Sequence, residues 1–155
     1  FFLIIEANRK WELENWRFVA KEISELNLAP QAPVLLYSGL IESKQLAWLS
    51  EPEHAAYLQS PFSYYPTGRS VISLPPQIQS DEEKKYFAEV LSKVLASNDH
   101  LIFVCLNQSL ANDDNSIYWT CENYEKLFRN KELHIEAGIS GGLVHGYILS
   151  SVINH

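Results

Sequence analysis

Few residues in this chain have the types and spacing of known catalytic motifs. Ser38, Asp113 and His145 supply the three side chains of a serine-hydrolase triad, and such triads are defined by geometry rather than by chain order. Any chain of this length offers a similar triple, and no GxSxG turn presents a nucleophile. The sequence also lacks a GxxxxGK[ST] phosphate loop, an HExxH pair and a CxxC pair. It therefore predicts no catalytic residue, no metal site and no cofactor.

One group of polar residues lies where α/β proteins often bind ligands. Ser38, Gly39 and Glu42 follow Val34–Tyr37, an apolar run that predicts a buried strand. Ligands of open α/β sheets bind beyond the carboxyl ends of the strands, so these residues are candidates for a ligand pocket. A structural role fits them equally, with Ser38 as a helix cap and Glu42 as an acid in the first turn.

Tyr64 and Tyr65 are the other candidate ligand-binding residues. They lie in the stretch 61–68, where two prolines and a glycine surround three aromatic residues. That composition predicts an ordered loop rather than a strand. Such a loop can cover an edge of the core, or it can act as a lid over a pocket at Ser38 and Glu42.

The two cysteines do not identify a cellular compartment. Cys105 stands inside the apolar run 101–106, which favours a small hydrophobic side chain in the core. A disulfide with Cys121 is the alternative, but strand interiors rarely present a sulfur to a partner. The sequence therefore favours two cysteines that are not bonded to each other.

Alternating strands and helices are predicted to position the candidate residues. Apolar runs predict strands over residues 34–37, 71–74 and 101–106. Apolar residues at helical spacing predict helices over residues 13–26, 41–49, 81–96 and 120–130. Capping-box patterns mark helix starts at Ser50–Glu53 and Ser80–Glu83, and the helix after Ser50 should stop before Pro61.

The end of the chain predicts a hairpin. Gly141–Gly142 separates two apolar stretches, 133–138 and 143–153. Two strands joined by a helical crossover form a βαβ unit, so the preceding strands should be parallel. The whole order predicts one α/β domain over residues 1–155. Its architecture should be a three-layer α/β/α sandwich, with a mostly parallel sheet and a C-terminal antiparallel hairpin at the edge.

Composition narrows the class of partner. The chain has 155 residues, of which 46% are hydrophobic and 20% are charged, as in an ordinary soluble globular domain. Its net charge is −7 and its pI is about 5.2. Nucleic-acid binding needs clustered lysine and arginine, so the sequence predicts no nucleic-acid partner.

The first residues predict a connection to something upstream. Phe1–Ile5 is an apolar run that is too short to span a bilayer. Residues 1–10 could be the tail of an upstream membrane segment, or they could form a first strand or a disordered start. A secretory signal would need a basic start and a cleavage site, and neither is present.

Several motifs together resemble a known family. They are the helix start Asn15-Trp16-Arg17, the stretches 32–36 and 38–42, the stretch 58–66 (LQSPFSYYP), Leu74-Pro75 and the closing 141–144 (GGLV). From about Asn15 to Ile148 the chain is similar to the soluble C-terminal region of bacterial polytopic glycosyltransferases. These belong to the protein-mannosyltransferase and aminoarabinose-transferase superfamily.

The resemblance implies a non-catalytic accessory domain on the extracytoplasmic face of the bacterial inner membrane. The parent enzyme would transfer a sugar from a polyprenyl-phosphate donor, and its catalytic acid would lie between membrane spans that this chain lacks. The implied partners are the transmembrane part of the same parent chain and the donor or acceptor. An alternative class is a free-standing α/β protein that binds a small molecule or nucleotide, or a hydrolase. That alternative predicts a closed pocket around Ser38 and Glu42.

Overall fold

A five-stranded mixed sheet forms the centre of the protein, in the strand order β2-β1-β3-β5-β4. The computed structural model describes residues 15–38, 46–106 and 119–151. The strands are β1 (Val34–Tyr37), β2 (Val71–Ser73), β3 (His100–Leu106), β4 (His134–Gly141) and β5 (Val144–Ser150). β1 pairs in parallel with β2 and β3, whereas β5 pairs antiparallel with β3 and β4. The predicted α/β class with a C-terminal antiparallel hairpin is confirmed.

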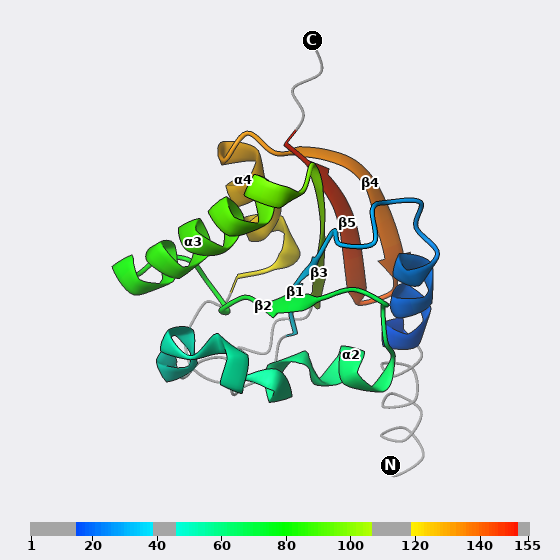
Figure 1. The fold of residues 1–155 in the computed structure, drawn as a ribbon, viewed down its shortest axis with the longest axis horizontal. Coiled ribbons are helices and arrows are strands. Elements are labelled where there is room, and N and C mark those ends of the chain that lie inside the picture. Colours follow the sequence, from blue (N-terminus) through cyan, green and yellow to red (C-terminus); the bar gives the residue numbers. More distant parts are fainter. Residues whose placement is uncertain (1–14, 39–45, 107–118, 152–155) are drawn as a thin grey trace.

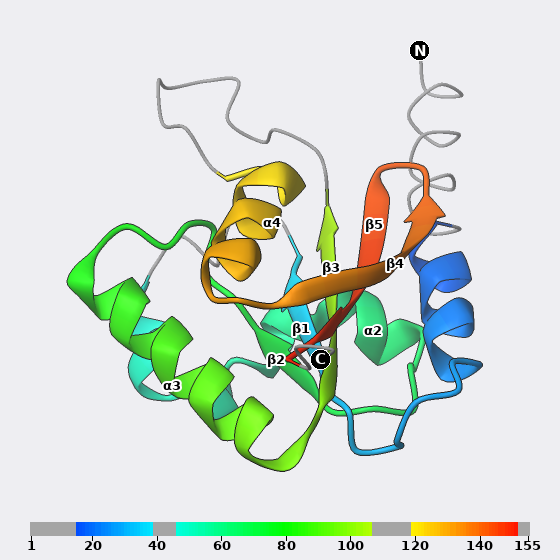
Figure 2. The ribbon, with the colours of Figure 1, turned by 90° about the horizontal axis from the view of Figure 1, so that it is seen from above.

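Helices cover both faces of this sheet (Figure 1). On one face lie α3 (Asp81–Ser97), α4 (Cys121–Asn130) and the short 3₁₀ helix η2 (Leu46–Ser50). The opposite face carries the N-terminal helix, described over residues 15–24, and α2 (Ser60–Tyr64). Figure 2 shows α3 and α4 on one side of the strands and the N-terminal helix on the other. The three-layer arrangement therefore holds.

Alternation along the strands creates two cores. Leu35 and Phe103 point to the layer of α3 and α4, where they join one buried cluster. Their strand neighbours Val34 and Ile102 join a second cluster with Trp16 of the N-terminal helix. Successive side chains of a strand point to opposite faces, so each helix layer buries its own half of the apolar residues.

The crossover from β1 to β2 differs from the prediction. Its described part contains three short 3₁₀ helices, η2, η3 (Pro52–His54) and η4 (Ala56–Gln59), followed by α2. The predicted capping box at Ser50 is wrong, because Ser50 ends η2 and its hydroxyl donates to the Ala47 carbonyl oxygen at 2.9 Å. Glu51 precedes η3 instead, and its side chain makes no capping hydrogen bond.

A second correction concerns Pro61. The sequence predicted a helix that stops before Pro61, followed by a loop, but Pro61 lies in the first turn of α2. Proline has no N–H, and an N–H in the first helical turn has no partner within the helix, so proline is accepted there. Residues 65–70 then form the loop that leads into β2.

The start of α3 follows the prediction. The Ser80 hydroxyl accepts a hydrogen bond from the Glu83 backbone N–H at 3.1 Å. In return the Glu83 carboxylate accepts from the Ser80 N–H at 2.8 Å and from the Gln79 N–H at 3.1 Å. This reciprocal pattern satisfies N–H groups that the helix itself cannot pair. The predicted capping box is therefore confirmed.

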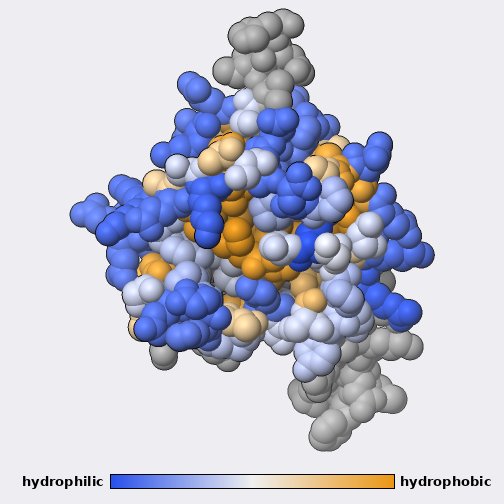
Figure 3. Space-filling model, viewed as in Figure 1, coloured by the Kyte–Doolittle hydropathy of each residue, from blue (hydrophilic) through white to orange (hydrophobic). Residues whose placement is uncertain are grey.

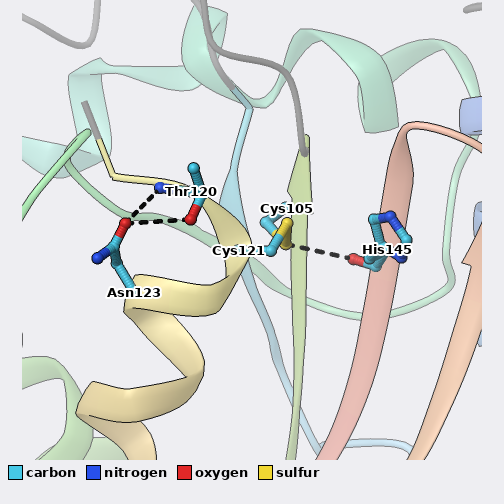
Figure 4. Close-up of a disulfide and its surroundings, with 5 residues drawn as sticks. All are labelled: Cys105, Thr120, Cys121, Asn123 and His145. Carbon is cyan, nitrogen blue, oxygen red and sulfur yellow. Dashed lines mark hydrogen bonds between the residues drawn. A yellow bond between two sulfur atoms is a disulfide. The ribbon is translucent and has the colours of Figure 1, made fainter. Parts of the chain in front are cut away.

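The expectation of unbonded cysteines is wrong, because Cys105 and Cys121 form a disulfide (Figure 4). Cys105 lies near the end of β3 and Cys121 is the first residue of α4, and their Cα atoms are 5.8 Å apart. The side chain of Cys105 points to the face on which α4 packs. The prediction failed because the first residue of α4 packs against the end of β3, next to Cys105. A sequence pattern does not show which distant segments pack together.

Candidate functional site

The strongest candidate site is a hollow of about 480 Å³ at the outer edge of β2. Its apolar lining includes Leu49 of η2, Ile72 of β2 and Val90 of α3. Small-molecule sites usually measure about 300–1,000 Å³ and combine apolar walls with a few polar groups. The hollow has the size and the composition of such a site.

Three charged side chains line this hollow. Glu53 comes from η3, and Glu89 and Lys93 come from α3. Glu89 and Lys93 are four residues apart on one helix, yet no ion pair joins any two of these three groups within the described parts of the chain. Their charges are available to a polar ligand. Carboxylates accept hydrogen bonds from hydroxyl and amino groups, and an ammonium group donates to oxygen atoms.

The side chains of Gln59 and Tyr86 bind two carbonyl groups of β2 beneath the hollow. Gln59 Nε2 donates to the Val71 carbonyl oxygen at 2.8 Å, and the Tyr86 hydroxyl donates to the Ser73 carbonyl oxygen at 2.7 Å. Burial raises the pKa of Tyr86 to about 12. The phenol therefore remains a neutral donor at any physiological pH.

Ser73, which lines the hollow, is not set up as a nucleophile. Ser73 is buried, and its hydroxyl oxygen has no hydrogen-bond partner. A nucleophilic serine needs a base within hydrogen-bonding distance, and none reaches this hydroxyl. Within residues 15–38, 46–106 and 119–151, no three histidine, cysteine or acidic side chains gather as a metal site.

The structure places the sequence-predicted site residues as follows. Ser38 is buried at the end of β1, whereas Gly39 and Glu42 lie outside the described residues. Tyr64 ends α2 with 74% of its surface exposed. Tyr65 is half-buried against the cluster that contains Trp16 and Phe62.

The triad drawn from sequence types is not assembled by the described residues. His145 lies on β5 opposite Cys105 of β3, and β3 separates it from β1, which Ser38 follows. The third member, Asp113, lies outside the described residues.

The Cys105 Sγ atom lies 3.8 Å from the His145 carbonyl oxygen. This is a sulfur–oxygen contact, because an oxidised sulfur has no proton to donate.

Sequence reasoning missed Glu53, Glu89 and Lys93. The sequence pattern predicts a capping-box role for Glu53, and Glu89 and Lys93 belong to the polar face of a well-defined helix. A charged residue on a polar helix face usually contacts only solvent, so the pattern gave no signal. The three side chains converge only because η3 and α3 flank the same strand edge.

The surface seen in the direction of Figure 1 carries small hydrophobic areas near its middle, which hydrophilic side chains separate (Figure 3). Isolated areas of this kind are normal for a globular domain. None of the described helices is both long enough and apolar enough to cross a bilayer.

Comparison with known proteins adds little to this description. No protein-family model matches the chain, and no curated protein matches it. Among solved structures, the 16S rRNA methylase ArmA is similar, with 13% sequence identity and a TM-score of 0.35. The match covers 77% of this chain and 74% of that chain. A similarity at this level carries no argument about function.

Proposed function

We propose that this chain is a non-catalytic accessory domain on the extracytoplasmic face of a membrane glycosyltransferase that uses a polyprenyl-phosphate sugar donor. The observation that carries the proposal furthest is the disulfide between Cys105 and Cys121. Structural disulfides persist in oxidising compartments outside the cytoplasm and are rare within it. The disulfide supports the location that the family resemblance implies.

In this proposal the transfer reaction belongs to the membrane part of the parent chain. The domain itself docks on that part, or helps to recognise the acceptor or the sugar of the donor. The hollow at β2 supports the second role, because Glu53 and Glu89 can accept hydrogen bonds from sugar hydroxyl groups. Lys93, on α3 like Glu89, can donate hydrogen bonds to sugar oxygens.

Two measurements test the proposal: the redox state of the two cysteines in the native cells, and the sequence that the gene encodes upstream of this chain. Thiols are blocked in intact cells, disulfides are then reduced, and the freed thiols are labelled with a maleimide that adds mass. We expect both cysteines to take the label only after reduction. We also expect the gene upstream of Phe1 to encode apolar windows of roughly 19 residues. Free thiols in the cell, or a start codon just before Phe1, would refute the proposal.

The hollow also favours a second candidate, a free-standing α/β protein that binds a small molecule or nucleotide. Its volume of about 480 Å³ suits a ligand of that class. A ligand that binds only the folded state raises the melting temperature. A panel of nucleotides and sugars should then contain at least one compound that raises it in the wild type but not in Glu89→Gln. If no compound does so, this candidate fails.

A further inference from the structure

One face of α3 forms a wall of the hollow beside β2. Tyr86, Glu89, Val90 and Lys93 line the hollow, and their spacing of three and four residues places them on the same side of the helix. Tyr86 is buried, Val90 is half-buried, and Glu89 and Lys93 are exposed. This wall therefore changes from an apolar and aromatic base to a charged rim.

The rest of the lining repeats this arrangement. Leu49 of η2 is buried and Ile72 of β2 is half-buried, whereas Glu53 of η3 is exposed. The hollow thus has an apolar base, and its rim carries two carboxylates and one ammonium group.

The three charged groups are available to a ligand. Within the described residues, none of Glu53, Glu89 and Lys93 forms a hydrogen bond or an ion pair. Glu89 and Lys93 are four residues apart, but an exposed pair at this spacing stabilises a helix only weakly. A bound ligand can therefore compete for both groups.

The balance of charge narrows the class of ligand. A phosphate group would be repelled by two carboxylates and attracted by only one ammonium group. A simple cation would leave Lys93 without a counter-charge, and a simple carboxylate would lie beside Glu53 and Glu89. Of these classes, only a zwitterion offers an opposite charge to all three groups, and an aliphatic body suits the apolar base.

We propose that the hollow binds a small zwitterion, of the class of α-amino acids with an aliphatic side chain. The ammonium group of the ligand would donate to Glu53 and Glu89, and its carboxylate would accept from Lys93. The side chain of the ligand would pack against Leu49 and Ile72. This ligand class rests on the binding role proposed for the hollow, but it depends neither on the location of the chain nor on a parent enzyme.

Titration of the 155-residue chain with leucine, followed by the NMR shifts of its backbone amides, tests the proposal. Isocaproate is leucine without the ammonium group, and leucinamide is leucine without the carboxylate. We expect leucine to shift the amides of Ile72 and Val90 and to bind about two- to fivefold more tightly than either analogue, which is the range of exposed charge pairs. If leucine leaves these amides unchanged, or if one analogue binds as tightly as leucine, the proposal is wrong.

Charge-removing variants assign each group. Glu89→Gln should weaken the binding of leucine and leucinamide by about two- to fivefold but not that of isocaproate, because isocaproate has no ammonium group. Lys93→Gln should weaken the binding of leucine and isocaproate but not that of leucinamide. Glu82→Gln and Lys85→Gln, at exposed positions of α3 outside the hollow, should bind leucine like the wild type. A variant of the hollow that weakens the binding of all three compounds equally would refute this assignment.

The result is separate from that of the proposed function. Leucine binding by a chain whose cysteines are free thiols in the cell would support the zwitterion site and refute the extracytoplasmic domain. A disulfide-bonded chain that does not bind leucine would show the reverse.

Discussion

Glu83 shows how one buried carboxylate organises a helix start. It is only 2% exposed, and it accepts hydrogen bonds from the backbone N–H groups of Gln79 and Ser80. We expect Glu83→Ala to lower the free energy of unfolding by about 1–2 kcal/mol, because two backbone donors at the helix start lose their acceptor. Urea unfolding measures the loss. Glu82→Ala, at an exposed position of the same turn, should cost less, and equal losses would contradict this account.

Tyr86 has a comparable role at the β2 edge. Its hydroxyl is the donor to the Ser73 carbonyl oxygen, and its ring packs edge-on against Trp48 with centroids 5.4 Å apart. Tyr86→Phe keeps the ring but leaves that carbonyl without this donor. We expect it to lower the free energy of unfolding by about 1–2 kcal/mol. Tyr57→Phe, at an exposed tyrosine, is the matched control and should have almost no effect in the same urea experiment.

The same residue predicts an alkaline limit to stability. Burial raises the pKa of Tyr86 from 10.0 to about 12, and burial also raises the pKa of Tyr124. Between pH 10 and about pH 12 the phenol of Tyr86 loses its proton in the unfolded chain but keeps it in the folded chain. The unfolded state therefore gains stability relative to the folded state as the pH rises. The contribution of these tyrosines to the free energy of unfolding should be constant below about pH 9 and fall as the pH rises above 10. In Tyr86→Phe the fall should be shallower, and an identical fall would contradict the assignment.

At the scale of elements, the turn of the β4–β5 hairpin sets how the N-terminal helix packs. A Cβ added at Gly141 would lie 2.8 Å from Val19 Cγ2 and 3.3 Å from the Asn15 carbonyl oxygen. We expect Gly141→Ala to lower the free energy of unfolding by about 1–3 kcal/mol, because the helix must move away from the hairpin. Thermal unfolding measures the loss.

Gly138 provides the control for this contact within the same strand. A Cβ there would meet only the Gly146 carbonyl oxygen, at an ordinary 3.7 Å. Gly138→Ala should therefore be close to neutral. If both alanine variants lose the same stability, the close approach of helix and hairpin is not the cause.

At the scale of the whole molecule, the disulfide joins the central sheet to one of its helix layers. It connects β3 to α4 across a sequence separation of 16 residues. Closing a loop of about this length stabilises a folded chain by about 3 kcal/mol through the entropy of the unfolded state. We expect reduction to lower the melting temperature and the free energy of unfolding by an amount of that order.

The variant Cys105→Ala/Cys121→Ala separates the bond from the reagent. It should melt near the temperature of the reduced wild type, and a reducing agent should not change it further. If reduction leaves the melting of the wild type unchanged, the disulfide does not support the fold. The location argued from it would then lose its main support.

Elements with local causes could be predicted from the sequence alone. The apolar run Val34–Tyr37 became β1, and the capping box at Ser80–Glu83 started α3. The Gly141–Gly142 signal marked the turn of the hairpin, where Gly142 has a φ of 71°. These features depend on periodicity, capping and backbone freedom, which neighbouring residues determine.

The contacts between residues far apart in the chain could not be predicted in this way, because they depend on the packed fold. The disulfide required α4 to begin over the end of β3, and the candidate hollow required η3 and α3 to flank the same strand edge. The two hydrogen bonds to the β2 carbonyl oxygens come from Gln59 and Tyr86, which belong to different elements. No local pattern encodes these meetings, because they follow from the strand order and from the packing of helices on the two faces of the sheet.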